Sequence, residues 1–324
     1  MLNLSRKIRT SRMISILRKF LPPLSFIIPF LILYRFYPES FDATWKGRAF
    51  YLFFLWVSFL ETTLNWENLQ PKNNRSLRAV AFTLTLLLPT LYVVLASPGG
   101  FNAWITAVAK QHKVYWADWM ALSTEYLVFA LLFSLILLLE YGRSGLRALP
   151  ISALFLGFIG SIYTIDNLYP FGRFAPLQIF VPATATLAAY VLNVLGYQTR
   201  FLPSVEGMPT LVAWNPIGEA RFQIAWPCSG VESLLLYAII LLLFLRIIDV
   251  PWKHKIIYFL VGAAVTYLIN ILRVTNLFVI TIRDGDWRSF HNFYGPLYSI
   301  IWITFYPLII SGSRFLRRKL KLAH

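Results

Sequence analysis

The sequence predicts an all-α polytopic membrane protein with about eight transmembrane helices and a small extracytoplasmic β-hairpin. Hydrophobic residues make up 58% of the 324 positions and charged residues 14%, whereas about a quarter of a soluble domain is charged. Apolar runs of roughly 17 to 25 residues recur along the chain, and each could cross a hydrocarbon core of about 30 Å as a helix. Lys and Arg gather in short tracts beside these runs, as they do in cytoplasmic loops of membrane proteins.

The eight spans follow from the apolar runs between charged or turn-rich breaks. A basic N-terminal segment precedes the first run as in a signal peptide, but no small-residue cleavage site follows, so we expect an uncleaved first span. The expected spans are 20–37, 48–64, 79–96, 121–140, 149–166, 228–248, 256–282 and 294–312. A further run, 176–196, contains Pro182, and we expect it to be interfacial or re-entrant, because an additional span would invert the charge bias.

The net charge is +16, and we interpret the basic residues behind it as the signal that orients the chain across the membrane. With eight spans, 19 of the 30 Lys and Arg residues lie on the inner side, 10 lie on the outer side, and Arg273 lies within a span. Both termini are then cytoplasmic. Because the basic residues flank apolar runs, they are expected to meet anionic lipid, and no nucleic-acid partner is predicted.

Four regions are expected along the chain. Residues 1–170 form an N-terminal transmembrane scaffold of about five spans. Residues 171–227 hold the interfacial or re-entrant helix and an outer hairpin, in which Thr210–Trp214 and Ala220–Trp226 flank a turn containing Asn, Pro and Gly. Residues 228–312 form a three-span core, and residues 313–324 form a basic cytoplasmic tail.

The single cysteine, Cys228, lies where the hairpin ends and a span begins. Pro227 favours the first turn of a helix, where unpaired N–H groups and the helix dipole lower the pKa of a thiol. Two interpretations are open. Cys228 is either a small apolar residue in a packed span or a reactive thiol, and the helix-start context favours the second more than an arbitrary membrane cysteine would.

Arg273 lies within the span 256–282, about ten residues from its outer end. An ionisable residue at that depth is costly and usually faces a bundle interior or a wet cavity. Asn270, three residues earlier, shares its helix face and is expected to orient the guanidinium. The alternative is a structural arginine that holds carbonyls of broken helices.

His291 lies in the short outer loop between the last two spans and can exchange protons near neutral pH. The predicted topology places Cys228, His291 and the outer half of the Arg273 span on the same side. A thiol, an imidazole and a guanidinium together could catalyse acyl transfer. The outer residue His112 lies in a segment expected to be a solvated or headgroup-facing surface. Neither Cys/His metal spacing nor a Gly-rich phosphate loop is present, so no cofactor or metal is predicted.

These residues resemble the exosortase/archaeosortase family of membrane-embedded transpeptidases. The resemblance rests on Cys228-Ser229-Gly230-Val231, on Asn270-x-x-Arg273 in the next span and on His291 before the last span. It covers roughly residues 170–312, with a weaker likeness in the N-terminal spans. Within it, Leu177-Gln178, the Ala-rich run after it and Leu195-Gly196 resemble the segment that precedes the hairpin in that family. In some archaeal members an arginine stands at the position of His291, so the histidine favours the exosortase pattern.

The resemblance implies a cysteine transpeptidase in a prokaryotic plasma membrane, with its active site facing outward. Its substrates would be exported proteins that end in a short motif, a hydrophobic helix and a basic cluster. The implied catalytic residues are Cys228 as nucleophile, Arg273 as oxyanion or substrate stabiliser and His291 as acid/base, with Ser229, Gly230 and Asn270 binding substrate or supporting the site. The acceptor would be a membrane lipid or another amine.

Two other functional classes of protein also fit the sequence. In a transporter or polysaccharide-export component, Arg273 would bind an anionic substrate, and loss of Arg273 would matter while loss of Cys228 would not. In a membrane scaffold, neither substitution would matter.

Overall fold

The computed structural model describes residues 18–43, 46–71, 76–170, 178–205 and 207–322. It divides into two compact units, 1–168 and 169–324, which are described separately. The basic segment before residue 18 and Leu177 of the predicted motif lie outside the described residues.

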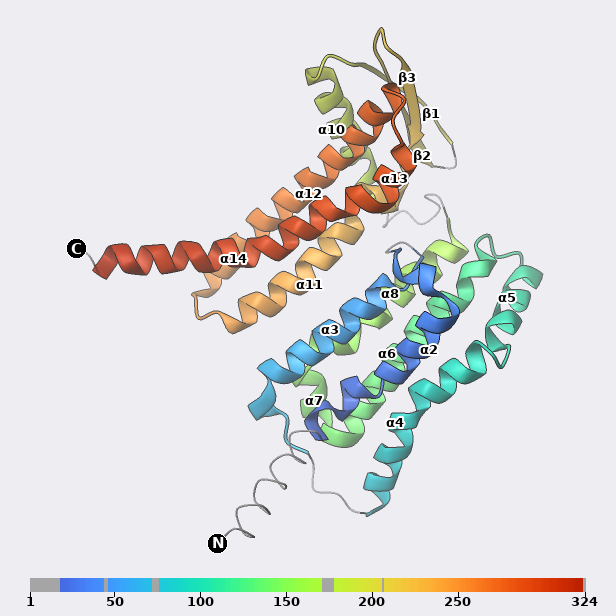
Figure 1. Cartoon of the computed structure of the whole chain (residues 1–324), viewed down its shortest axis with the longest axis vertical. Coiled ribbons are helices and arrows are strands. Elements are labelled where there is room, and N and C mark those ends of the chain that lie inside the picture. Colours follow the sequence, from blue (N-terminus) through green and yellow to red (C-terminus); the bar gives the residue numbers. More distant parts are fainter. Residues whose placement is uncertain (1–17, 44–45, 72–75, 171–177, 206, 323–324) are drawn as a thin grey trace. The chain divides into compact units, whose positions relative to one another are not determined.

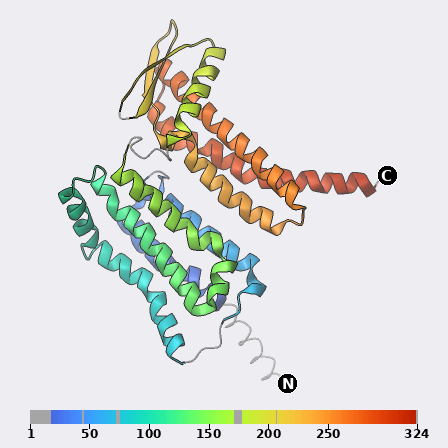
Figure 2. The ribbon, with the colours of Figure 1, turned by 180° about the vertical axis from the view of Figure 1, so that it is seen from behind.

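Unit 1 is a bundle of helices (Figure 1). Its helices are α2 (Ile27–Phe36), α3 (Ala49–Leu64), α4 (Ser76–Ala96), α5 (Phe101–Gln111), α6 (Met120–Tyr141), α7 (Arg143–Ala148) and α8 (Pro150–Leu168). Helices α6 and α8 lie side by side (Figure 2). Helix α5 was not predicted.

Aromatic packing and buried charge pairs hold unit 1 together. Phe26 lies edge-on to both Phe54 and Phe129, with ring centroids 5.2 and 5.6 Å away. The Arg48 guanidinium donates two hydrogen bonds of 2.8 Å to the Glu125 carboxylate. Such bidentate pairing offsets part of the cost of burying both charges.

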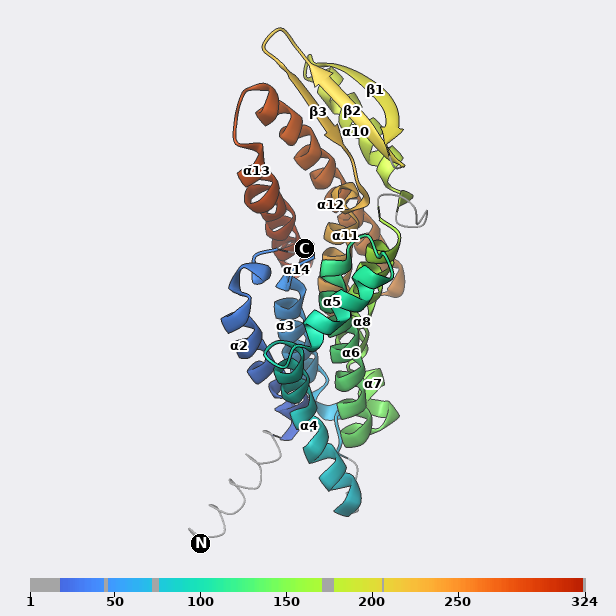
Figure 3. The ribbon, with the colours of Figure 1, turned by 90° about the vertical axis from the view of Figure 1, so that its right-hand side faces the viewer.

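Unit 2 places a small sheet and one helix at the end of three packed helices (Figures 1 and 3). Helix α10 (Val181–Val194) packs on β1 (Gln198–Val205) and β2 (Met208–Trp214). Strand β3 (Glu219–Gln223) and a 3-10 turn, Trp226–Ser229, lead into α11 (Val231–Ile247) and α12 (Trp252–Ile282). The chain continues through α13 (Trp287–Ser289) and a π-helical turn, Phe290–Tyr294, into α14 (Gly295–Leu322).

The sheet corrects the predicted two-stranded hairpin. It is antiparallel with order β1-β2-β3. The two predicted strands are β2 and β3, and sequence reasoning missed β1, which pairs with the outer edge of β2. The β2–β3 turn is as expected: the Asn215 side-chain oxygen accepts hydrogen bonds from the backbone N–H groups of Ile217 and Gly218, at 2.9 and 3.2 Å. The last strand ends at Gln223, three residues earlier than predicted.

Helices occupy all eight predicted spans, but the number of spans is not confirmed at eight. In the described part of the chain, five helices are long and apolar enough to cross a membrane: Arg18–Phe36, Ala79–Ala96, Ala117–Tyr141, Pro150–Leu168 and Trp252–Ile282. Ala49–Leu64 and Leu297–Ser313 are apolar but shorter, and α11 has 17 residues. The chain is a mostly helical, multi-pass membrane protein with a small sheet.

Candidate active site

The cysteine lies in a 3-10 turn and not in the first turn of a span helix, which corrects the sequence prediction. The Cys228 N–H donates to the Ala225 carbonyl at 3.0 Å, and the buried Ser229 hydroxyl donates to the Trp226 carbonyl at 2.6 Å. Gly230 then adopts a left-handed conformation, with φ of +93°, before α11 begins at Val231. The turn ends in a backbone conformation that only glycine adopts readily.

Asn270 fixes this turn from α12. The Asn270 side chain is fully buried, and its Nδ2 donates to the Cys228 carbonyl at 2.9 Å. A Cβ atom on Gly230 would lie 3.0 Å from the same Nδ2. Asn270 therefore holds the backbone of the cysteine turn, whereas the sequence predicted that it would orient Arg273.

Two residues that sequence reasoning missed complete the support of the turn. The Thr184 hydroxyl, on α10, donates to the Ser229 carbonyl at 3.1 Å, and it lies 2.9 Å from the Tyr267 hydroxyl of α12. Because the Thr184 proton is used toward Ser229, Tyr267 is the donor of the second bond. One signal was available: Tyr267 stands three residues before Asn270 and shares its helix face.

Arg273 lies against the beginning of α14. Its Nη2 donates to the His291 carbonyl at 3.1 Å. Gly295 leaves room for the side chain, since a Cβ there would lie 2.6 Å from the Arg273 Nε. The guanidinium thus connects α12 to the segment that carries the histidine.

His291 lies in a π-helical turn and not in an open loop, because α13 and α14 continue helically on both sides of it. The Asp286 carboxylate caps α13 by accepting from the N–H groups of Arg288 and Ser289, both at 3.1 Å. The His291 Nδ1 is buried, and no group in the described residues bonds to it. π-Helical turns are frequent at functional sites.

Cys228 and His291 line one cavity of about 140 Å³. Its walls are mainly apolar and aromatic, and the Phe222 ring meets Phe278 and Trp287 edge-on, with centroids 5.0 and 5.5 Å apart. The remaining lining residues are Gln223, Ile224, Val274 and Leu277. The cavity therefore joins the last strand, the cysteine turn, α12 and the histidine turn.

Electrostatics at this cavity favour neutral resting groups. Burial raises the pKa of the Cys228 thiol; the positive charge of Arg273 opposes this shift, and Glu232 adds to it. Burial, together with Arg273, lowers the pKa of His291. The resting pair is a thiol and a neutral imidazole, so the expected lowering of the cysteine pKa is not met.

The described residues offer no cluster of three His, Cys, Asp or Glu side chains that could hold a metal ion. The cavity lining instead includes a nucleophile, Cys228, and a base, His291. Arg273 does not line the cavity, but its positive charge acts on both groups. This is a donor set for acyl transfer.

A comparison with known protein families identifies the family of this chain. The family described as Transmembrane exosortase (Exosortase_EpsH) matches residues 44–308. No curated protein and no solved structure is similar enough to the chain to count as a match. Since the family match covers most of the chain, including the cysteine turn and the histidine turn, the chain belongs to the exosortase family.

Proposed function

We propose that this exosortase-family protein is a membrane-embedded cysteine transpeptidase. It cleaves a C-terminal sorting signal from exported proteins and transfers the remaining chain to an amine or lipid acceptor on the outer face of a prokaryotic plasma membrane. The observation that supports the proposal most is that Cys228 and His291 line one cavity while the charge of Arg273 acts on both.

In the first half-reaction, the Cys228 sulfur attacks the scissile carbonyl carbon and His291 accepts the thiol proton. Negative charge develops on the carbonyl oxygen, and Arg273 stabilises it. The C–N bond then breaks, and the leaving nitrogen takes the proton from His291. The products are an acyl thioester on Cys228 and a released peptide consisting of the hydrophobic helix and basic cluster.

In the second half-reaction, an acceptor amine attacks the thioester carbonyl and His291 accepts its proton. The C–S bond breaks, and the sulfur recovers a proton from His291. Because one acyl group passes from one nitrogen to another, the transfer needs no oxidant or reductant.

The supporting residues have distinct functions in this scheme. Asn270 and Thr184 hold the backbone carbonyls of Cys228 and Ser229, which keeps the sulfur at the cavity. Gly230 permits the turn by its left-handed φ. These are positioning residues, and catalysis by the reacting groups depends on the geometry that they maintain.

The test uses an exported protein from the same genome that ends in a short motif, a hydrophobic helix and a basic cluster. It is co-expressed with the wild-type protein, with Cys228→Ala and with Cys228→Ser, and its maturation is followed by mass shift. Both variants should abolish processing while remaining folded in the membrane by size-exclusion chromatography. Normal maturation in Cys228→Ala would rule out the cysteine mechanism.

The orientation of the site is tested separately. Cys228 is the sole cysteine in the sequence, so a membrane-impermeant maleimide reports on this position alone. We expect labelling of intact cells from outside, slowed by the partial burial of the side chain. Labelling that requires lysis would place the site on the inner face.

A further inference from the structure

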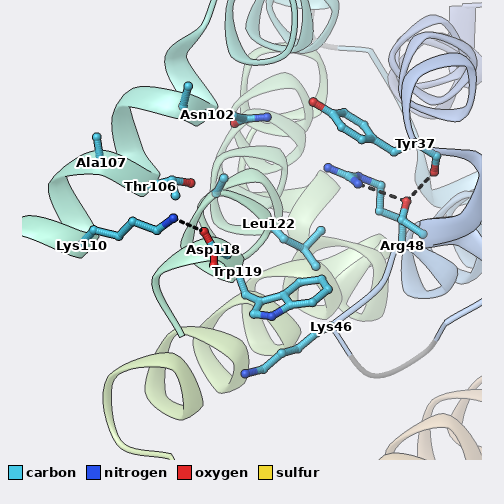
Figure 4. Close-up of a pocket in the computed structure, with 13 residues that line it drawn as sticks. Tyr37, Lys46, Arg48, Asn102, Thr106, Ala107, Lys110, Asp118, Trp119 and Leu122 are labelled. Carbon is cyan, nitrogen blue, oxygen red and sulfur yellow. Dashed lines mark hydrogen bonds and ion pairs between the residues drawn. The ribbon is translucent and has the colours of Figure 1, made fainter. Parts of the chain in front are cut away.

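Unit 1 contains a second cavity, of about 530 Å³, that the proposed acyl transfer does not use. Figure 4 shows Tyr37 and Arg48 on one side of it and Asn102, Thr106 and Lys110 on the other. Lys46, Ala107 and Asp118 also line it. The volume is in the range of small-molecule sites.

Helix α5 separates this cavity from an apolar surface. Asn102, Thr106 and Lys110 recur every four residues and therefore share the helix face toward the cavity. On the other face, the side chains of Phe101 and Trp104 are 39% and 59% exposed and line an apolar hollow of about 450 Å³. An amphipathic helix with a polar inner face and exposed aromatic rings suits a membrane interface.

Three cations line the cavity, and two of them form buried ion pairs with carboxylates of the protein. Arg48 is buried and makes its bidentate pair with Glu125. Lys46 is buried and lies 3.0 Å from Asp166. Removing the carboxylate partner of such a buried cation is strongly destabilising. A ligand is therefore not expected to displace either carboxylate.

Lys110 differs because its pair with Asp118, at 2.7 Å, is exposed, with 60% and 71% of the two side chains accessible. Exposed pairs of this kind contribute between nothing and about 1 kcal/mol. Lys110 can therefore turn to one ligand anion at little cost. Asp118 is then left as an acceptor for ligand O–H groups.

Uncharged polar groups also face this cavity. The Asn102 Oδ1 is buried, and no donor in the described part of the chain reaches it. Thr106 and Tyr37 contribute hydroxyl groups to the lining. A ligand that matches this surface carries one negative charge for Lys110 and O–H donors for Asn102 and Asp118.

We propose that this cavity binds the headgroup of a membrane lipid whose phosphodiester carries a hydroxylated substituent. The single anion pairs with Lys110, the headgroup hydroxyls bond to Asn102 and Asp118, and the acyl chains remain in the bilayer beside α5. A lipid is the favoured source because the helix that forms one wall presents aromatic rings on its opposite face.

The test measures lipid binding to the purified full-length protein by native mass spectrometry in micelles. Phosphatidylglycerol is compared with phosphatidylmethanol, which has the same charge and acyl chains but no headgroup hydroxyl. We expect at least several-fold tighter binding of phosphatidylglycerol. Equal binding of the two lipids would overturn the proposed hydroxyl recognition.

Variants locate the binding site. Lys110→Gln should weaken phosphatidylglycerol binding several-fold, as expected when one cation beside an anionic headgroup is lost, and Ala107→Trp should weaken it further by obstructing the cavity. Lys113→Gln is the matched control, since Lys113 is an exposed residue that does not line the cavity. Equal weakening by the two lysine substitutions would show nonspecific charge attraction and overturn the site.

A soluble competitor separates the two possible sources of the headgroup. Millimolar glycerophosphoglycerol should leave the lipid bound, because the acyl chains contribute to affinity. Complete displacement would assign the cavity to a soluble phosphodiester and refute a lipid ligand. Thermal unfolding of each variant checks that lost binding does not reflect lost folding.

Discussion

Substituting Gly295 with alanine tests the position of Arg273 by adding one methyl group. The added Cβ would lie 2.6 Å from the Arg273 Nε, where ordinary contacts are 3.4–4 Å. The guanidinium must therefore retreat by about 0.8 Å, the difference between 3.4 and 2.6 Å, and its 3.1 Å bond to the His291 carbonyl is disturbed. Misplacement of a catalytic group by about 1 Å can reduce a rate about 100-fold.

We expect Gly295→Ala to lower processing of the sorting-signal substrate about 100-fold, equivalent to about 2.7 kcal/mol of transition-state stabilisation. Gly295 has helical angles, φ −59° and ψ −48°, which alanine adopts without strain. Because the Cβ would also lie 3.0 Å from the Phe290 carbonyl oxygen, thermal unfolding of the variant is measured beside its processing rate. Alanine is favoured over glycine in a helix by roughly 1 kcal/mol.

The assay compares initial processing rates in membranes with equal amounts of each variant. Gly312→Ala is the matched control, since it lies in the same helix and a Cβ there meets nothing within 4 Å. Wild-type processing by Gly295→Ala would refute the importance of the Arg273 position. Equal loss in both variants would show a general effect on α14.

Three further predictions concern the same site. Gly230→Ala should lower stability by roughly 1–2 kcal/mol, because a left-handed φ is costly for alanine and the Cβ crowds Asn270; an unchanged midpoint of thermal unfolding would contradict this. Asn270→Leu should lower the free energy of unfolding by about 1–3 kcal/mol, because the Cys228 carbonyl loses its donor, and it should also reduce processing, measured on the same membranes. Since burial and Arg273 lower the pKa of His291 below its ordinary value of 6.5, most of the imidazole in the wild-type protein is neutral at that pH, and processing should decline only at lower pH. Arg273→Gln should raise that pKa and move the acidic limb of the residual pH–rate profile upward, and an unmoved limb would argue against His291 as the base.

The main features of the fold could be predicted because hydrophobic run length depends on local sequence. Helices occur at each predicted span, and α10 lies within the run that was expected to be interfacial or re-entrant. Strand β1 was missed because it contains Pro203 and polar residues, and its structure depends on pairing with β2. The amphipathic α5 was missed because its 11 residues are too few to resemble a span.

The identity of the site residues could be predicted, but their contacts could not. Periodicity placed Asn270 and Arg273 on one helix face, whereas the structure gives them different partners, the Cys228 carbonyl and the His291 carbonyl. Thr184 could not be found from sequence, because its function depends on how α10 packs against the cysteine turn. The thiol pKa was misjudged because sequence does not reveal burial, which raises this pKa and outweighs the opposing positive charge of Arg273.

Neutral resting groups have a consequence for how the proposed reaction begins. Burial disfavours both the thiolate and the imidazolium, so a preformed ion pair between them is costly before substrate arrives. Proton transfer from sulfur to His291 becomes favourable only as negative charge moves onto the substrate carbonyl oxygen near Arg273. Alkylation of Cys228 should therefore be slow in the free protein at neutral pH, even though the same preparation cleaves the sorting-signal substrate at its normal rate. Rapid alkylation of the free protein, at the rate of an exposed thiolate, would show that the cavity activates sulfur without substrate.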